Sequence, residues 1–95
     1  NKERNNETLT LVIEGRLDTV TAPELEKVVN EETADIKELV LDMNALEYIS
    51  SAGLRVLLAA QKKMNKQGSM KLKGVCDAVM EVFEMTGFAD ILAIE

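Results

Sequence analysis

Two adjacent serines, Ser50 and Ser51, are the residues of this sequence best placed to carry chemistry. They follow a short apolar segment, residues 46–49, and precede residues 53–64, whose apolar side chains recur at helical spacing. One serine must therefore lie near the N-cap of a helix, where the first N–H groups lack partners and carry partial positive charge. This is a natural anion site, but a plain helix cap is the simpler alternative, because Ser is a leading N-cap residue.

A phosphate on Ser51 would add about 1.5 to 2 negative charges at this helix end. The positive end of the helix can accommodate that charge without unfolding, so the change would act on the surface rather than on the core. Ala52 and Gly53 leave the surface free of large side chains.

Two charged residues near the serines are further candidates for binding. Arg55, one turn into the helix, either pairs with a carboxylate of a partner or stays solvated. Asp18 contacts a partner, hydrogen-bonds the loop before Ser51, or acts as a plain turn residue. Asp42 ends a predicted strand, but the sequence places no second carboxylate beside it for a metal or acid–base role.

The composition argues against an enzyme. The sequence has no His and one Cys, Cys76, which excludes a Ser-His or Cys-His nucleophile pair, most zinc sites and an intramolecular disulfide. Its glycines are isolated, so no glycine-rich phosphate loop is present. A small acyl or phosphoryl transferase remains the enzymatic alternative, but we expect no catalytic residue, metal or cofactor.

The charge balance points towards protein partners. The 95 residues include 11 Lys and Arg against 17 Asp and Glu, for a net charge of −6. Nucleic acids and anionic membranes need a basic surface, so neither is expected, whereas a basic protein partner would suit this chain. No run approaches the roughly 18 apolar residues of a membrane span, and no signal-peptide core is present. We therefore expect a cytoplasmic protein.

The first half of the sequence alternates between strand and helix patterns. Residues 9–13 have the period of a strand that Gly15 should end, and residues 16–18 could pair as a short return strand or form a loop. Thr21 and Glu24 have the spacing of a capping box at a helix start.

The second half continues the alternation. Residues 39–43 and 70–75 read as strands, and Gly68 should end the helix that follows the serines. Asp77 should cap a third helix that ends at Gly87.

A last strand is expected over residues 91–94. Strands separated by helices predict an α/β fold in which a mixed, mostly parallel sheet of four to five strands packs against helices. We expect one domain over residues 1–95, with an ordered core of about 8–94.

Around the serines, the sequence resembles the STAS-domain family of bacterial anti-sigma factor antagonists. The motif of that family is an acidic or small residue, the phosphorylated Ser or Thr, a small residue, Gly and Leu. The matching positions are Ser50, Ser51, Ala52, Gly53 and Leu54. The resemblance therefore implies that Ser51 is the phosphoacceptor.

Two further segments resemble the family. Residues 15–18, Gly-Arg-Leu-Asp, are similar to the Gly-x-Leu-Asp turn beside the phosphorylation site, and residues 82–88 to a helix that ends in Ser/Thr-Gly-Leu/Phe. Ser50 stands where well-studied members often have Asp, which makes it a second possible acceptor behind Ser51. The chain starts without Met and lacks the C-terminal helix of the family, so we expect residues to be missing at its ends.

The resemblance implies partner switching. The unphosphorylated protein would bind an anti-sigma factor, a serine kinase that holds the ATP itself, and free the sigma factor. Phosphorylation of Ser51 would end binding, and a phosphatase would reset the site. The binding residues implied are Asp18, Ser50, Ser51, Ala52, Gly53, Leu54 and Arg55. The alternative is a STAS scaffold or ligand-sensing module that binds partners without phosphorylation.

Overall fold

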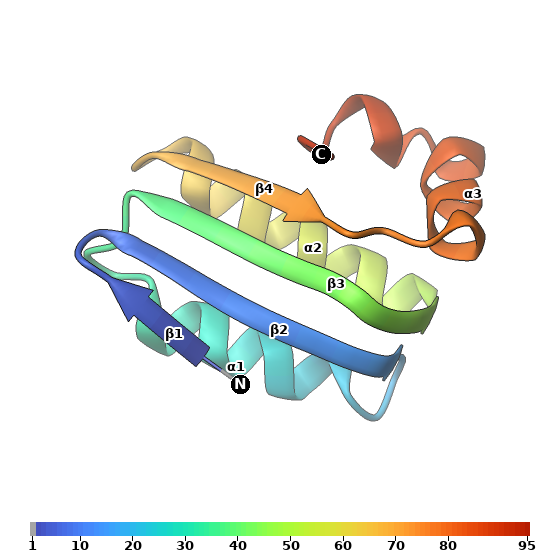
Figure 1. Cartoon of the computed structure of the whole chain (residues 1–95), viewed down its shortest axis with the longest axis horizontal. Helices are drawn as coiled ribbons and strands as arrows, with labels where there is room; N and C mark the ends of the chain where they lie inside the picture. Colours follow the sequence, from blue (N-terminus) through green and yellow to red (C-terminus); the bar gives the residue numbers. More distant parts are fainter. Residues whose placement is uncertain (1) are drawn as a thin grey trace.

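A four-stranded mixed sheet forms the frame of the molecule (Figure 1). The computed structural model describes residues 2–95, so Asn1 of the predicted domain lies outside the described residues. The spatial order is β1-β2-β3-β4, in which β1 is antiparallel to β2 and the other pairs are parallel. The strands are β1 (Lys2–Asn5), β2 (Thr8–Leu17), β3 (Glu38–Ile49) and β4 (Ser69–Lys73). The prediction of a mixed, mostly parallel sheet is confirmed.

Two helices cover one face of this sheet. In Figure 1, α1 (Ala22–Glu32) and α2 (Ser51–Asn65) both lie behind the strands. Each helix connects neighbouring parallel strands, and because such crossovers are right-handed, two successive steps in one direction place both helices on one face. The helix α3 (Asp77–Thr86) and the 3₁₀ turn η1 (Phe88–Asp90) lie at the end of the sheet beyond β4 (Figure 1).

The core is largely aliphatic and is formed by the sheet, by these two helices and by Val79 and Phe83 of α3. On β3, the buried residues Leu39, Leu41 and Met43 recur with the two-residue period of a strand. Phe83 of α3 is the aromatic side chain in the core, which is consistent with the low aromatic content of the sequence. The larger fully buried side chains are Phe83, Leu17, Ile36, Leu39, Leu41, Met43, Leu46, Leu57, Met64, Met70, Leu72 and Val79.

Two strands are longer than the sequence indicated. Gly15 adopts a positive φ of 73°, but it does not end β2, because the strand continues through it by means of register irregularities between Val12 and Glu14 and between Gly15 and Arg16. The expected return strand or loop at residues 16–18 is therefore mostly the end of β2 itself. Likewise, residues 46–49 belong to β3, so this strand runs directly to the serines.

The two ends of the chain differ from the expectation. β1 pairs with the start of β2 and was not predicted, because its polar sequence has no apolar alternation to mark it. The expected strand over residues 91–94 is wrong. After α3 the chain turns at Gly87, with a φ of 82°, and residues 88–90 form η1. The chain then meets β4 through a single bridge between Ile94 and Leu72, in which the N–H of Leu72 donates to the carbonyl oxygen of Ala93 and the N–H of Glu95 donates to that of Leu72.

Three helix ends differ in detail from those that the sequence predicted. Thr21 is the N-cap of α1, but its side chain makes no capping bond to the helix. The N-cap of α3 is Cys76 rather than Asp77, which is the first helical residue. α2 ends at Asn65, three residues before Gly68. Gly68 does not have a left-handed conformation, but a Cβ at this position would collide with the backbone of Lys37.

The substitution Gly68→Ala should therefore destabilise the protein. The carbonyl group of Lys37 accepts the N–H of Ser69 at 2.8 Å and cannot move without disturbing the start of β4. We expect a loss of about 2 kcal/mol or more in the free energy of unfolding, measured by urea denaturation. Gly87→Ala is the control, because it adds left-handed strain in open space and should cost only about 1–2 kcal/mol. Equal or higher stability of the first variant than of wild type would contradict this account.

Candidate functional site at the start of α2

The two segments that the sequence singled out meet at Leu17, the last residue of β2. The carbonyl oxygen of Leu17 accepts the backbone N–H of Ser50 at 2.8 Å. A Cβ on Gly53 would lie 2.8 Å from the same oxygen and 2.9 Å from the side chain of Ile49. Only glycine therefore lets the first turn of α2 approach the end of β2 this closely.

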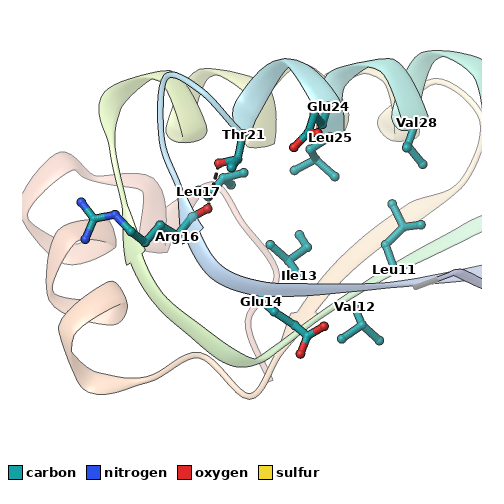
Figure 2. A pocket seen from close by; sticks show the side chains of 10 residues that line it. All are labelled: Leu11, Val12, Ile13, Glu14, Arg16, Leu17, Thr21, Glu24, Leu25 and Val28. Atoms are coloured by element: carbon teal, nitrogen blue, oxygen red, sulfur yellow. Dashed lines mark hydrogen bonds between the residues drawn. The ribbon is translucent and has the colours of Figure 1, made fainter.

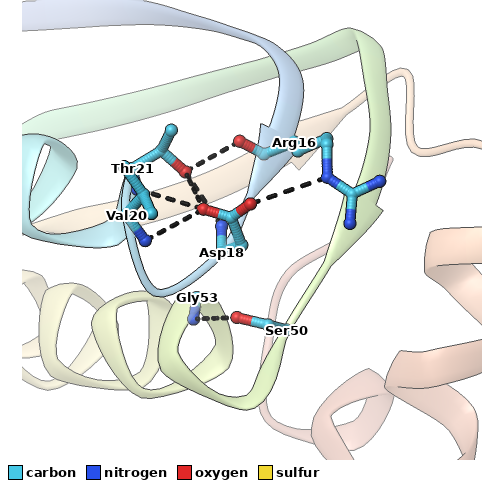
Figure 3. A network of polar contacts seen from close by, with 6 residues as sticks. All are labelled: Arg16, Asp18, Val20, Thr21, Ser50 and Gly53. Carbon is cyan, nitrogen blue, oxygen red and sulfur yellow. Dashed lines mark hydrogen bonds and ion pairs between the residues drawn. The ribbon is translucent and has the colours of Figure 1, made fainter.

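Ser50 is the residue that caps α2. It has extended backbone dihedral angles, its Oγ accepts the N–H of Gly53 at 3.4 Å, and its carbonyl oxygen accepts the N–H of Leu54 at 2.9 Å (Figure 3). These bonds leave the N–H groups of Ser51 and Ala52 without an intrahelical acceptor. The helix end is thus capped and still electropositive.

Ser51 is the first residue of α2, and it is exposed. Within residues 2–95, its hydroxyl group makes no hydrogen bond to the protein. The two serines are therefore distinct: one hydroxyl group forms the cap, and the other faces solvent at the positive end of the helix.

The remaining predicted site residues fall into two groups. Ala52 is half-buried and Arg55 is exposed, so both reach the surface near Ser51. Gly53 and Leu54 are buried, and Leu54 is only 7% exposed and belongs to the hydrophobic core. These two residues therefore support the surface from beneath, and their contact with a partner stays a prediction.

Asp18 organises the loop between β2 and α1. Its Oδ1 accepts the backbone N–H groups of Val20 at 3.0 Å and Thr21 at 3.2 Å (Figure 3). These bonds to Thr21 and Val20 hold the pKa of the Asp18 carboxyl group below its usual value. Within the described residues its side chain bonds to Val20, Thr21 and Arg16 and not to residues 46–51, which supports the turn role. Contact of Asp18 with a partner stays a prediction.

Sequence reasoning missed three surface residues beside the serines. Val20 is 78% exposed at the tip of the Asp18 loop, and Tyr48 of β3 is 42% exposed. The guanidinium group of Arg16 lies 4.2 Å from the centre of the Tyr48 ring, and its Nε lies 3.5 Å from Asp18. Val20 could have been found in the sequence as a single large apolar residue within a predicted turn. The contact between Arg16 and Tyr48 could not, because it depends on the pairing of these residues across β2 and β3.

Two hollows adjoin this region. The first, of about 310 Å³, lies between β2 and α1, where the side chains of Leu11 and Ile13 point towards Leu25 and Val28 of the helix (Figure 2). The second, of about 380 Å³, lies beside Ser51 and is lined by Thr19, Ala22, Pro23, Glu26, Ala52, Arg55 and Val56.

No three His, Cys, Asp or Glu side chains of residues 2–95 gather to hold an ion. The Oδ1 of Asp42 accepts the backbone N–H and the side-chain amide of Asn44, which lowers the pKa of the Asp42 carboxyl group. Cys76 is half-buried, and its thiol group lies 3.4 Å from the carbonyl oxygen of Leu46.

The sheet with both long helices on one face, and the serine-capped helix docked on the end of β2, define a STAS-like α/β architecture. The model of the STAS domain family matches residues 1–95. The chain belongs to the STAS-domain family.

Several proteins similar to this chain are anti-sigma factor antagonists. The anti-sigma-B factor antagonist of Listeria monocytogenes is 32% identical over 98 residues, covering 99% of this chain and 84% of the relative. The crystal structure of an anti-sigma factor antagonist from Mycobacterium paratuberculosis has a TM-score of 0.88 at 27% identity, covering 99% of this chain and 81% of that one.

The phosphorylated form of the Bacillus cell fate determinant SpoIIAA shares the fold. Its TM-score is 0.78 at 15% identity, covering 100% of this chain and 89% of that one. The chain is therefore similar to anti-sigma factor antagonists in sequence and fold.

The contact between Gly53 and Leu17 predicts that alanine at position 53 destabilises the protein, although alanine stabilises most helices. In an open helix, Gly→Ala stabilises by about 1 kcal/mol, but at Gly53 the new methyl group would push α2 away from β2. We expect Gly53→Ala to lower the free energy of unfolding by roughly 1–3 kcal/mol in urea denaturation. The control Ala59→Gly, at an exposed position of α2, measures the helix-propensity effect alone. A stabilised Gly53→Ala variant would show that the contact does not constrain the site.

The loop bonds of Asp18 predict a dependence of stability on pH. Because the folded state holds this carboxylate with two N–H groups, its pKa is lowered from 3.8, and the unfolded chain takes up the proton first. The stabilisation is present above pH 3.8 and is lost as the pH falls towards the folded-state pKa.

Asp18→Asn should consequently flatten the acid side of the stability profile, measured by urea denaturation from pH 7 to pH 3. Glu47→Gln removes an exposed carboxylate of β3 and should leave the profile close to that of wild type. Identical profiles for wild type and Asp18→Asn would contradict the role assigned to Asp18.

Proposed function

We propose that this protein is an anti-sigma factor antagonist switched by phosphorylation of Ser51. In the unphosphorylated state it binds an anti-sigma factor that is a serine kinase, and the sigma factor is released. The kinase then transfers the γ-phosphoryl group of its ATP to Ser51 Oγ, ADP is released, and the hydroxyl proton passes to a base of the kinase. The complex dissociates, and a phosphatase resets the serine.

The observation that carries this proposal is the different environment of the two serines. Ser51 is exposed at the first position of α2 with a free hydroxyl group, whereas the Ser50 hydroxyl group accepts the N–H of Gly53. A kinase can approach the first without breaking any bond of the domain. Modification of Ser50 would first have to release the hydroxyl group that caps α2, so Ser51 is the proposed acceptor.

The fold can accept a phosphate at this position. The first N–H groups of α2 carry partial positive charge, and Ser51 lies outside the core. The phosphorylated SpoIIAA structure supports the view that the STAS fold is compatible with a phosphate group. The modification is therefore expected to change the surface and leave the fold intact.

A docked partner would not accept the same phosphate. A dianion enclosed in a packed interface loses its hydration, and without a matching cation on the partner this costs several kcal/mol. A cost of about 3–4 kcal/mol would weaken binding by roughly two to three orders of magnitude. The exposed residues Val20, Tyr48 and Arg55 around Ser51 are proposed to form the docking surface with it.

The chain itself needs no cofactor in this scheme, because ATP and its metal ion belong to the kinase. No helix among residues 2–95 is both long and apolar enough to cross a membrane. We propose that the protein acts by binding, not catalysis, in the cytoplasm, with an anti-sigma factor kinase and a phosphatase as partners and no nucleic acid. The relatives named as anti-sigma factor antagonists support this role.

Phosphorylation should occur at Ser51 alone. Purified protein incubated with ATP and the candidate anti-sigma factor kinases of its source should gain one phosphate, located by mass spectrometry on Ser51. The phosphate should be absent from Ser51→Ala and retained in Ser50→Ala, which keeps the exposed hydroxyl group. Phosphate on Ser50 in the wild type would overturn the assignment.

Binding to the same kinase should follow the charge at position 51. Ser51→Ala should bind as tightly as wild type without ATP, whereas Ser51→Asp should bind at least about tenfold more weakly, as measured by calorimetry. Circular dichroism checks that both variants remain folded. Equal affinities would favour the scaffold that binds partners without phosphorylation.

A further inference from the structure

Two arginines lie near the start of α2, but their environments differ. Arg16 has its Nε 3.5 Å from Asp18 and its guanidinium group over the ring of Tyr48 (Figure 3 shows the first contact). Arg55 is exposed and makes no ion pair with any residue in the described range 2–95. Glu26 lines the same hollow as Arg55 but is not paired with it. Arg55 is therefore the cation of this region that is available to a new anion.

The helix places Arg55 within reach of Ser51. The two residues are separated by four positions in α2, and residues at this spacing lie on one side of a helix, with Cβ atoms about 5–6 Å apart. Side chains in a helix lean towards its N-terminus, so a long side chain at the fifth position covers the turn that holds the first.

A hollow adjoins Arg55 and leaves room for its side chain to move. It measures about 380 Å³ and is lined by Arg55 together with small side chains such as Ala22 and Ala52. The five N–H donors of an arginine match the oxygens of a phosphate in a paired arrangement.

We propose that Arg55 binds the phosphate group of phosphorylated Ser51 within the same chain. This inference rests on the proposed phosphorylation of Ser51 and adds a residue with a defined role in the phosphorylated state. Arg55 contacts the phosphate and acts as a positioning residue, because it takes no part in the transfer reaction. The contact holds the dianion against the first turn of α2.

The contact gives the switch a second component. Before phosphorylation, Arg55 is free to meet a carboxylate on the surface of the anti-sigma factor. After phosphorylation it is occupied by the phosphate of its own chain. One modification then adds a dianion to the docking surface and removes a cation from it, so both changes weaken the complex.

The test uses protein with phosphoserine installed at position 51 by genetic-code expansion, so no kinase is needed. Phosphorus-31 NMR over a pH titration gives the second pKa of the phosphate. With Arg55 present this pKa should be lower, by roughly half a unit, than in the phosphorylated Arg55→Gln variant. The electropositive end of α2 acts in both proteins, so the difference isolates the arginine.

Two further variants sharpen the comparison. Lys62→Gln removes an exposed cation of the same helix that lies about 16 Å along the axis from Ser51. The phosphate on Ser51 of this variant should titrate as in the phosphorylated wild type. Arg55→Lys should restore part of the shift, because it keeps the charge but not the paired geometry. The shift should also shrink as salt is added.

Equal pKa values in wild type and Arg55→Gln at low salt, with both proteins folded by circular dichroism, would overturn the inference. So would an equal shift on removal of Lys62, since the effect would then be general electrostatics. Because the phosphate is installed without a kinase, failure of this test leaves the proposed switch standing. Failure of a kinase to modify Ser51 would refute the proposed function instead.

Discussion

The approach of α2 to the carbonyl group of Leu17 is the constraint on which the candidate site depends. Leu17 is 2% exposed, and its carbonyl oxygen takes the N–H of Ser50 while Gly53 passes within contact distance. One buried strand end thereby fixes where the helix begins. It also joins the Gly-Arg-Leu-Asp segment to the serine segment, which lie more than thirty residues apart in the sequence. This contact fixes where the first turn of α2, with its cap at Ser50 and the exposed Ser51, lies against the sheet.

A rigid helix start is a suitable place for a covalent switch. The cap at Ser50 satisfies the N–H of Gly53, and the core holds Leu54, so the first turn is fixed from beneath. The hydroxyl group of Ser51 is left outside this framework. A charge added at Ser51 acts on molecules that contact this surface, because the bonds that maintain the fold do not involve the Ser51 side chain.

Overall charge and local charge describe different properties of this protein. The net charge of −6 argues against nucleic acid and anionic membranes. Near the serines, however, Arg16 and Arg55 bring two cations together, of which the first is already engaged by Asp18 and Tyr48. The chemistry of the proposed docking surface therefore depends on which charges are already paired within the domain, and composition does not reveal that.

The sequence alone determined the α/β class, the helix that follows the serines and the place of Ser51 near its start, because these depend on local periodicity and on caps. It could not reveal β1, the continuation of β2 through Gly15, or the loss of the expected strand over residues 91–94, since pairing partners far along the chain decide them. Only the tertiary structure assigned Ser50 to the cap, turned Asp18 inward to its own loop, and buried Gly53 and Leu54. The reason is physical: a local pattern sets what each segment can form, but which atoms become satisfied and which stay free is decided by the long-range packing of α2 against β2.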